Sequence, residues 1–372
     1  MAPHPPVALS ILLAVGIISS CEWPQAPEWN VDLLVPFGRQ TLGIDSLLPA
    51  GVSVRTAEGH PTFFVELLQD SARYSLGQVC ARCRPLQGIT APVPGFDLAD
   101  TLRLAFPRDL ISMDVVTAAL GVRFTNGLDF DPLRPNADPA AAGWVRVEAI
   151  DAGSGAVLDS LLINGADETL PVGMSRDLVL RFRDRTLSGG ILVAASIHSP
   201  RDGQTTTVDT AATLQVEPVV DTIAVSAVTA EVRGGHLSSD YEIRFERGIR
   251  DDVVDRIQEA LIELELRHTL EIAGTLDVSL AGSPRDLFAD RGRSIRLRPV
   301  DFSYAPDGRA ITRSLTAEEI QFLAGLPRIY VGLSAVADAR TLDGRGRPAV
   351  TFLPTDSIVT RLQITTNVEA ND

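Results

Sequence analysis

The feature that most constrains the fold is a long run of alternating residues in the last third of the chain. From Ile262 to Leu280 the even-numbered positions are apolar apart from His268 and Gly274, while most odd-numbered positions are charged or polar. Apolar residues at a spacing of two indicate a strand with one buried face. A single strand here would be about 60 Å long at ~3.3 Å per residue, so we expect it to bend at Gly274. The alternative is a hairpin that turns at residues 273–275.

The same alternation marks both ends of the folded part of the chain. Apolar side chains recur at every second position from Trp29 to Phe37. In the closing segment Ile358, Leu362, Ile364 and Val368 share one parity, while charged and polar side chains take the other. Each segment is typical of a half-buried strand. We predict that the two strands belong to one sheet, with Leu33 and Ile364 at the spacing of neighbouring strands.

The middle of the chain has an all-β pattern. Between about residues 113 and 218, six apolar or β-branched runs are separated by turn residues such as Asn126-Gly127 and Asn164-Gly165. This density predicts a Greek-key β-sandwich of immunoglobulin-like size. The Cys, Trp and Cys spacing of true immunoglobulin domains does not occur, so the comparison concerns architecture alone. The six runs are 113–124, 144–150, 156–163, 176–183, 189–198 and 211–217.

Two short helices are predicted after the sandwich. Apolar residues occur at helical spacing over 253–261. The acids at 251–252 precede them and would stabilise the positive N-terminal end of the helix dipole. A capping box at 316–319 opens a second helix, which Gly325 and Pro327 end. A strand at 329–337 follows. We therefore expect an α+β domain with long antiparallel strands and two short helices.

The first twenty residues have the layout of an export signal. The apolar run from Val7 to Ile18 has the length of a signal-peptide core and is too short to span a bilayer. The tetrapeptide Ile18-Ser19-Ser20-Cys21 resembles the lipobox of bacterial lipoproteins. The resemblance implies cleavage before Cys21 and acylation of its thiol. The alternatives are a plain signal peptide with an incidental cysteine, or an uncleaved buried helix.

The lipoprotein resemblance also implies a location. Glu22 follows the cysteine in place of the aspartate associated with retention in the inner membrane, which favours the outer membrane, on its periplasmic or surface face. The expected protein is thus membrane-anchored in the cell envelope. Its predicted segments are a signal peptide (1–20), a lipidated tether (21–28), an N-terminal β segment that joins the C-terminal sheet (29–110), a β-sandwich (111–220) and an α+β domain (221–372).

Charge excludes several functions. All 33 basic residues are arginine, and they are outnumbered by 48 acidic residues, for a net charge of −15. Without lysine the chain has no Schiff-base or P-loop chemistry. Its acidity also makes nucleic acid an unsuitable partner. The expected partners are the membrane, through the lipid, and either another envelope protein or a lipid.

Cys80 and Cys83 form the one motif with potential chemistry. In an exported protein a local disulfide is the favoured interpretation. A redox centre would need a strand and a helix N-terminus around the pair, and zinc would need further ligands. Haem attachment would need histidine where Arg84 stands.

No catalytic residue, metal site or cofactor is predicted. The five histidines are scattered, and no Gly-x-Ser-x-Gly motif is present. Asp129 and Asp131 resemble the opening of a calcium loop without its glycine and distal glutamate, so a solvated turn is favoured.

These observations favour a non-catalytic binding or structural module. The alternative is a carrier of an apolar or lipid ligand, whose tubular cavity would be bounded by Leu264, His268 and Leu276. A third hypothesis is an envelope hydrolase that uses two carboxylates. One basic cluster pairs with the abundant acids or contacts lipid phosphate near the anchor; its members are Arg291, Arg293, Arg296 and Arg298.

Overall fold

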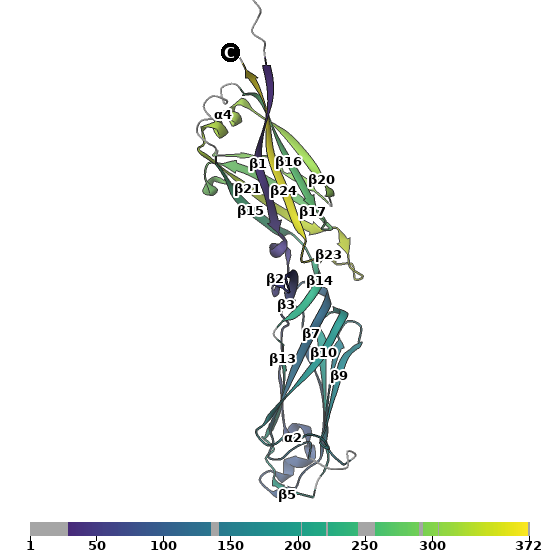
Figure 1. Cartoon of the computed structure of the whole chain (residues 1–372). Coiled ribbons are helices and arrows are strands. Elements are labelled where there is room, and N and C mark those ends of the chain that lie inside the picture. The colour runs from purple at the N-terminus through teal and green to yellow at the C-terminus, as the bar shows by residue number, and fades with distance from the viewer. Residues whose placement is uncertain are drawn as a thin grey trace, which may run out of the picture.

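The computed structural model describes residues 29–134, 141–201, 203–220, 222–244, 257–289, 293–303 and 305–370. The molecule is elongated and consists of two β-rich lobes that follow one another along its length (Figure 1). We call the lobe that contains both ends of the described chain the proximal lobe, and the other the distal lobe. The proximal lobe comprises β1, β15–β21, β24 and α4, and the distal lobe comprises β2–β14, β22 and β23.

The proximal lobe has two antiparallel sheets. The first contains, in spatial order, β1 (Trp29–Gly43), β24 (Ser357–Ala370), β16 (Ile257–His268) and β20 (Ala305–Leu315). The second contains β15 (Gly235–Arg244), β21 (Arg328–Ala339) and β17 (Ile272–Ala281), with β18 (Ser294–Arg296) and β19 (Val300–Phe302) both paired to β17. Apolar residues from both sheets belong to one buried core. The lobe is therefore a β-sandwich.

The two end strands of the described chain are neighbours. β1 pairs with β24 along its length, with Leu33 opposite Thr366 and Val35 opposite Ile364. The predicted pairing of these strands is therefore found. It places β24 between β1 and β16, so the first sheet depends on residues from the far end of the chain.

The distal lobe is built around a nine-stranded sheet, a four-stranded sheet and a two-stranded ribbon. The large sheet contains β2 (Val52–Ala57), β3 (His60–Val65), β4 (Ala72–Ser75), β7 (Leu110–Gly127), β10 (Ser175–Ser188), β13 (Thr213–Val219), β14 (Ile223–Glu231), β22 (Thr341–Leu342) and β23 (Pro348–Phe352). The four-stranded sheet contains β6 (Phe96–Leu104), β11 (Ile191–Ser199), β8 (Trp144–Asp151) and β9 (Val157–Asn164). The ribbon pairs β5 (Thr90–Pro92) with β12 (Thr205–Thr207).

The prediction of a mainly β chain with a sandwich is confirmed. All six strands expected between residues 113 and 218 are present as β7, β8, β9, β10, β11 and β13. Buried and half-buried positions alternate along all of β11, as expected for a strand with one face on a core. The predicted segment 29–110 is divided between the lobes, because β1 joins the proximal lobe and β2–β6 join the distal lobe.

The alternating run over 262–280 is neither one strand nor a hairpin at 273–275. The chain leaves β16 after His268 and enters β17 at Ile272, in the other sheet of the sandwich. Both strands direct their even-numbered side chains into the shared core, so the pattern continues across the break. Gly274 lies within β17, where a Cβ atom would be 1.9 Å from the Val336 carbonyl oxygen. This glycine permits close strand approach and does not make a turn.

One predicted helix is present and the other is wrong over its described part. α4 (Ala317–Gly325) begins after Thr316, and both hydrogen bonds of the predicted capping box with Glu319 form. The expected helix over 253–261 is replaced from Ile257 by β16, while residues 251–256 lie outside the described residues. Burial of alternate residues between two sheets overrides the helical spacing there. The other short helices in the described part of the chain are η1 (Ile44–Leu47), α2 (Leu76–Val79), η2 (Ala81–Leu86) and η4 (Pro284–Asp286).

Candidate functional site

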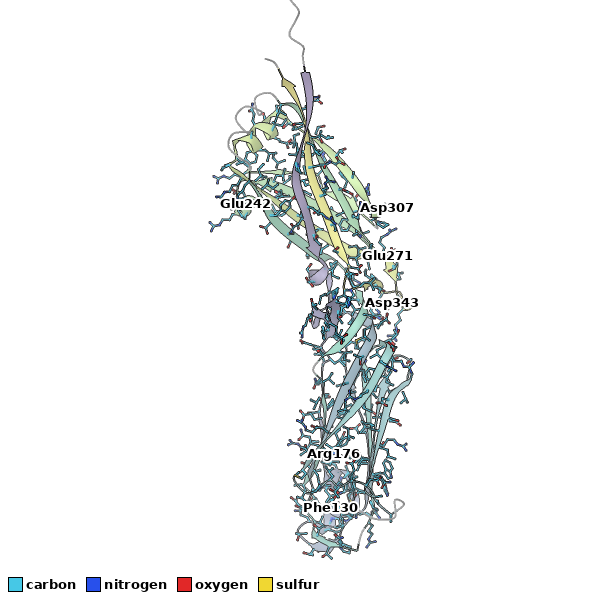
Figure 2. The ribbon with its side chains drawn as sticks, viewed as in Figure 1. Phe130, Arg176, Glu242, Glu271, Asp307 and Asp343 are labelled. Atoms are coloured by element: carbon cyan, nitrogen blue, oxygen red, sulfur yellow. A yellow bond between two sulfur atoms is a disulfide. The ribbon has the colours of Figure 1, made fainter. Side chains whose placement is uncertain are left out.

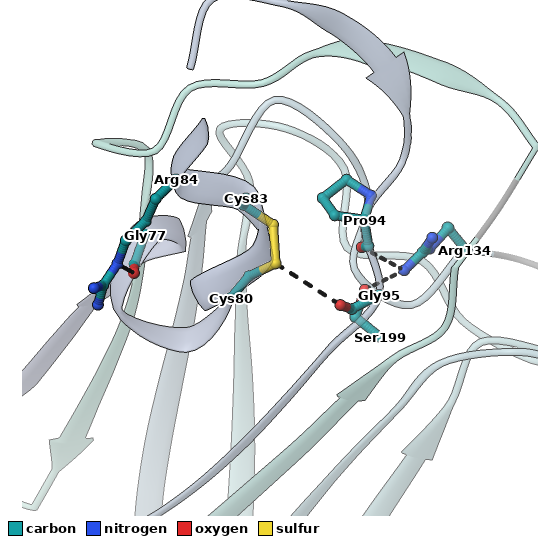
Figure 3. Close-up of a disulfide and its surroundings, with 8 residues drawn as sticks. All are labelled: Gly77, Cys80, Cys83, Arg84, Pro94, Gly95, Arg134 and Ser199. Carbon is teal, nitrogen blue, oxygen red and sulfur yellow. Dashed lines mark hydrogen bonds between the residues drawn. A yellow bond between two sulfur atoms is a disulfide. The ribbon is translucent and has the colours of Figure 1, made fainter. Parts of the chain in front are cut away.

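The end of the distal lobe farthest from the chain ends is a cluster of loops that we call the tip. It contains α2, η2, the β5–β12 ribbon and the loop at residues 128–134 (Figures 1 and 2), together with the turn at residues 171–174 that is hydrogen-bonded to Asn126. Cys80 and Cys83 are joined by a disulfide with a Cα–Cα distance of 5.3 Å, and Cys80 Sγ lies 4.0 Å from the Gly95 carbonyl oxygen (Figure 3). Both cysteines are buried. The disulfide therefore braces the junction of α2 and η2 from inside.

Asn126 organises the loops beside the disulfide. Its side chain is fully buried at the end of β7, and Nδ2 donates hydrogen bonds to the carbonyls of Phe130 at 3.0 Å and Leu170 at 2.8 Å. Its Oδ1 accepts a hydrogen bond from the Leu128 amide at 2.9 Å. A buried amide with satisfied hydrogen bonds fixes the geometry of the backbone around it. The sequence shows only an Asn-Gly pair here, because the contact with Leu170 depends on the fold.

Arg134 holds a second part of the tip. Its guanidinium lies over the Phe130 ring at 5.7 Å, and Nη2 donates hydrogen bonds to the Pro94 carbonyl at 3.4 Å and to Ser199 Oγ (Figure 3). Only 8% of the residue is exposed. The arginine thus ties the 128–134 loop to the segments on both sides of it. No pattern in the sequence marks this role.

Asp131 has a structural role in the same loop. One carboxylate oxygen accepts a hydrogen bond from the Leu133 amide at 2.9 Å, and the other accepts one from the Leu170 amide at 3.0 Å. The favoured interpretation as a turn residue agrees with these contacts. Within the described residues no group of three or more His, Cys, Asp or Glu side chains is placed to hold a metal ion.

The tip exposes apolar side chains on this braced framework. Ile89 is 51% exposed beside the ribbon, and Val172 and Met174 are each 56% exposed. The turn that carries the latter two is hydrogen-bonded to Asn126, which donates its amide to the Met174 carbonyl and accepts from the Gly173 amide. Exposed apolar groups held by a rigid loop cluster can bind a partner at a low entropic cost.

The residues predicted to bound a ligand cavity lie in the proximal lobe. Leu264 and His268 in β16 and Leu276 in β17 are each 1% exposed and belong to the buried core of the sandwich. The structure thus brings all three into one core, with side chains from both sheets around them. Leu264 also lines an open groove at the edge of the lobe. The proposed tubular cavity stays a prediction.

His268 is the buried titratable group of that core. Its Nε2 donates to the Ser303 carbonyl at 3.0 Å, and its ring meets the Phe302 ring edge to face at 5.7 Å. Burial lowers the pKa of His268 below its ordinary value, although the Ser303 carbonyl opposes this shift. Nδ1 is buried and makes no hydrogen bond of normal geometry among the described residues. The nearby Leu270 backbone favours the charged ring, and it raises the pKa by less than burial lowers it. The ring is best suited to pack neutral in the core.

Two features predicted from the sequence belong to the N-terminus. Cys21 and the tether at 21–28 lie outside the described residues. Among the residues that the structure does describe, no helix has the length and apolar character needed to cross a bilayer.

Comparisons with known proteins identify no family for this chain. No family profile and no curated protein matches the sequence. Among solved structures, the chain is similar to a "putative secreted protein" from Parabacteroides distasonis ATCC 8503, at 8% identity and a TM-score of 0.31, over 90% of this chain and 99% of that one. It is also similar to the tandem CBM22 domains of Paenibacillus barcinonensis Xyn10C, at 10% identity and a TM-score of 0.16, over 92% and 99% of the respective chains. Similarities at these values do not indicate a function.

Proposed function

We propose that this protein is a lipid-anchored protein of the cell envelope that acts as a non-catalytic binding module. One observation carries the proposal. The ends of the described chain lie at one end of an elongated molecule, and the disulfide-braced tip lies at the other (Figure 1). A chain attached to a membrane through a residue shortly before β1 would hold this tip away from the bilayer.

The proposed attachment is the acylated thiol of Cys21. Burial of acyl chains contributes about 0.8 kcal/mol per methylene group, and the net charge of −15 would oppose binding to anionic headgroups by the protein surface itself. Attachment would therefore depend on the lipid. The residue after the cysteine, Glu22, favours the outer membrane.

The anchor can be tested with a labelled fatty acid fed to cells that make the protein. The full chain should incorporate the label and sediment with membranes, whereas the Cys21→Ala variant should incorporate none and remain in the soluble fraction. The Cys80→Ser variant is the matched control and should be labelled like the parent protein. An unlabelled parent chain would rule out the lipid anchor.

The proposed binding surface is the tip, and its proposed partner is another envelope protein. A photo-activated crosslinking residue placed at Ile89 or Met174 in living cells should capture one and the same protein from both positions. Val157, which is 57% exposed on the side of the distal lobe, is the matched control position and should capture none. Equal capture from the tip and from Val157 would contradict a binding role for the tip.

A further inference from the structure

The proximal sandwich has two edges of different construction. At one edge β1 lies against β15, and Gln40 Nε2 donates a hydrogen bond to Ser239 Oγ at 2.9 Å. At the opposite edge the outermost strands are β20 of the first sheet and the β18–β19 segment of the second sheet. Across this second edge the described hydrogen bonds come from two arginine side chains of β20 and from His268, which donates to the Ser303 carbonyl between β19 and β20. The sandwich is therefore joined at one edge and spread apart at the other.

The bridging arginines point inward. Arg309 lies opposite Leu266 and Arg313 lies opposite Ile262 in the pairing of β20 with β16. Residues opposite each other in a sheet direct their side chains to the same face, and both partners on β16 are buried in the core. Two charged side chains thus occupy positions where a closed sandwich would have apolar residues.

Each arginine reaches the facing sheet. Arg309 Nη1 donates to the Asp301 carbonyl at 3.4 Å, and Arg313 Nη1 donates to the Arg296 carbonyl at 3.2 Å. Arg313 also forms an ion pair with Glu319 of α4 at 2.7 Å. Partial burial of Glu319 raises its pKa, but hydrogen bonds from Thr316 and Arg313 outweigh this effect and hold the pKa below its ordinary value. The two edges are consequently held apart by the length of an arginine side chain.

The space between the edges is a groove of about 600 Å³, a size typical of small-molecule sites. We call it the edge groove. Its apolar lining consists of Ile262, Leu264, Leu297, Val300 and Ile311. Its other lining residues are Arg298, Pro299, Asp301, Arg309, Thr312 and Arg313.

The charge of the edge groove is opposite to that of the chain. Three arginines and one carboxylate, Asp301, line it, whereas the whole chain has a net charge of −15. The third arginine, Arg298, is exposed and forms no ion pair with another described residue. Apolar walls with cationic groups at the rim match a ligand that has an alkyl chain and an anionic headgroup.

A peptide strand fits the edge groove less well. The carbonyls of Arg296 and Asp301 already accept hydrogen bonds from arginine, and Pro299 has no N–H to donate. An added strand would need these groups for its backbone pairing.

We propose that the edge groove binds a single-chain anionic amphiphile, with the alkyl chain against the half-buried Val300 and Ile311 and the headgroup at Arg298 and Arg309. This site does not depend on the anchor or on the tip. It would give the carrier hypothesis a location at the edge of the sandwich, in place of the core around His268 and Leu276.

The test is calorimetric titration of the full chain carrying Cys21→Ala with dodecyl phosphate below its micelle concentration. We expect saturable binding to one site, and binding at least about tenfold weaker to dodecyl maltoside and to inorganic phosphate, because each lacks half of the recognised chemistry. Equal binding of dodecyl maltoside would overturn the role of the arginines. Equal binding of inorganic phosphate would overturn the role of the apolar walls.

Variants locate the site. The double variant Arg298→Gln, Arg309→Gln should weaken dodecyl phosphate binding by on the order of tenfold, while the matched double variant Arg181→Gln, Arg183→Gln on the distal lobe should leave it unchanged. Equal affinity in all three proteins would overturn the proposal. Tighter binding of an acidic apolar peptide than of dodecyl phosphate would also overturn it, as would binding only to vesicles that contain phosphatidic acid.

Inward charges on edge strands can also prevent association between sheets. If the parent protein bound no amphiphile and the R298Q/R309Q variant self-associated, the arginines would serve to prevent association instead.

Discussion

The two lobes are both β-sandwiches, yet they are assembled from the chain in different ways. The distal lobe takes its strands from residues 52–231 and adds only β22 and β23 from elsewhere. The proximal lobe needs both ends of the described chain, because β24 is an inner strand between β1 and β16. Pairing of residues so far apart carries a larger loop-closure cost. We therefore expect the distal lobe, with β22 and β23, to form without β24, and the proximal lobe not to close until that strand is present.

The lobes also differ in how their ends are secured. The tip of the distal lobe is held by the Cys80–Cys83 disulfide, the buried amide of Asn126 and the guanidinium of Arg134. The proximal lobe has one edge joined at Gln40 and Ser239 and one edge spread by arginines. A rigid tip suits contact with a folded partner, whereas a spread edge can admit a small ligand.

The largest expected effect is the loss of the proximal lobe when β24 is removed. A chain that ends at Asp356 lacks the inner strand of the first sheet, so β1 and β16 lose the hydrogen bonds that they make with β24 and the sheet is divided. Hydrogen exchange should show β16 and β1 unprotected while β7 and β8 remain protected. Loss of protection in β7 as well would show that the two lobes fold as one unit.

A smaller effect is expected from single cavities in each core. Leu362 in β24 is 2% exposed and Leu120 in β7 is 1% exposed. Replacement of either by alanine should cost about 2–5 kcal/mol of unfolding free energy. In urea unfolding followed lobe by lobe, Leu362→Ala should lower only the proximal transition and Leu120→Ala only the distal one. A shift of both transitions by either variant would show coupling between the lobes.

Removal of the disulfide should have a still smaller effect, confined to the distal lobe. The Cys80→Ser, Cys83→Ser variant opens a very short covalent loop, for which the chain-entropy relation gives roughly 2 kcal/mol. The urea midpoint of the distal transition should fall, and that of the proximal transition should not. Two free thiols in the unreduced parent protein, detected by mass spectrometry, would contradict the bridge.

The smallest expected effect is a pH dependence of the proximal lobe. Burial lowers the pKa of His268 in the folded chain, whereas an unfolded histidine titrates at about 6.5. The unfolded state therefore binds more protons below that pH, and stability falls as the pH drops from about 6.5 toward the folded pKa.

A matched variant isolates this histidine. His268→Phe keeps a ring in the core and cannot take up a proton. The proximal transition of the parent should weaken more than that of the variant between about pH 7.5 and pH 5.5, measured by urea unfolding. Identical losses in the two proteins would show that His268 does not contribute.

Local patterns predicted local structure well. The strands of the middle region and the capping box at Thr316 are present. The predicted pairing of the two end strands is also present, although it joins residues far apart in the chain. The helix expected over 253–261 was wrong from Ile257, because helical spacing and strand alternation overlap in short apolar runs and the choice between them depends on burial. The site at the tip was harder to predict, since the partners of Asn126 and Arg134 come from distant segments.

The sequence by itself determined many of the strands, which side chains face inward along them, and which two cysteines can pair, because these properties depend on neighbours within a few positions. Only the tertiary structure decided that the run through His268 divides between two sheets. It also decided that Arg309 and Arg313 point into an open edge and that the tip lies far from the chain ends. The physical reason is that alternation records the face of a strand and not the identity of its partner, which is chosen by contacts between residues far apart in the chain.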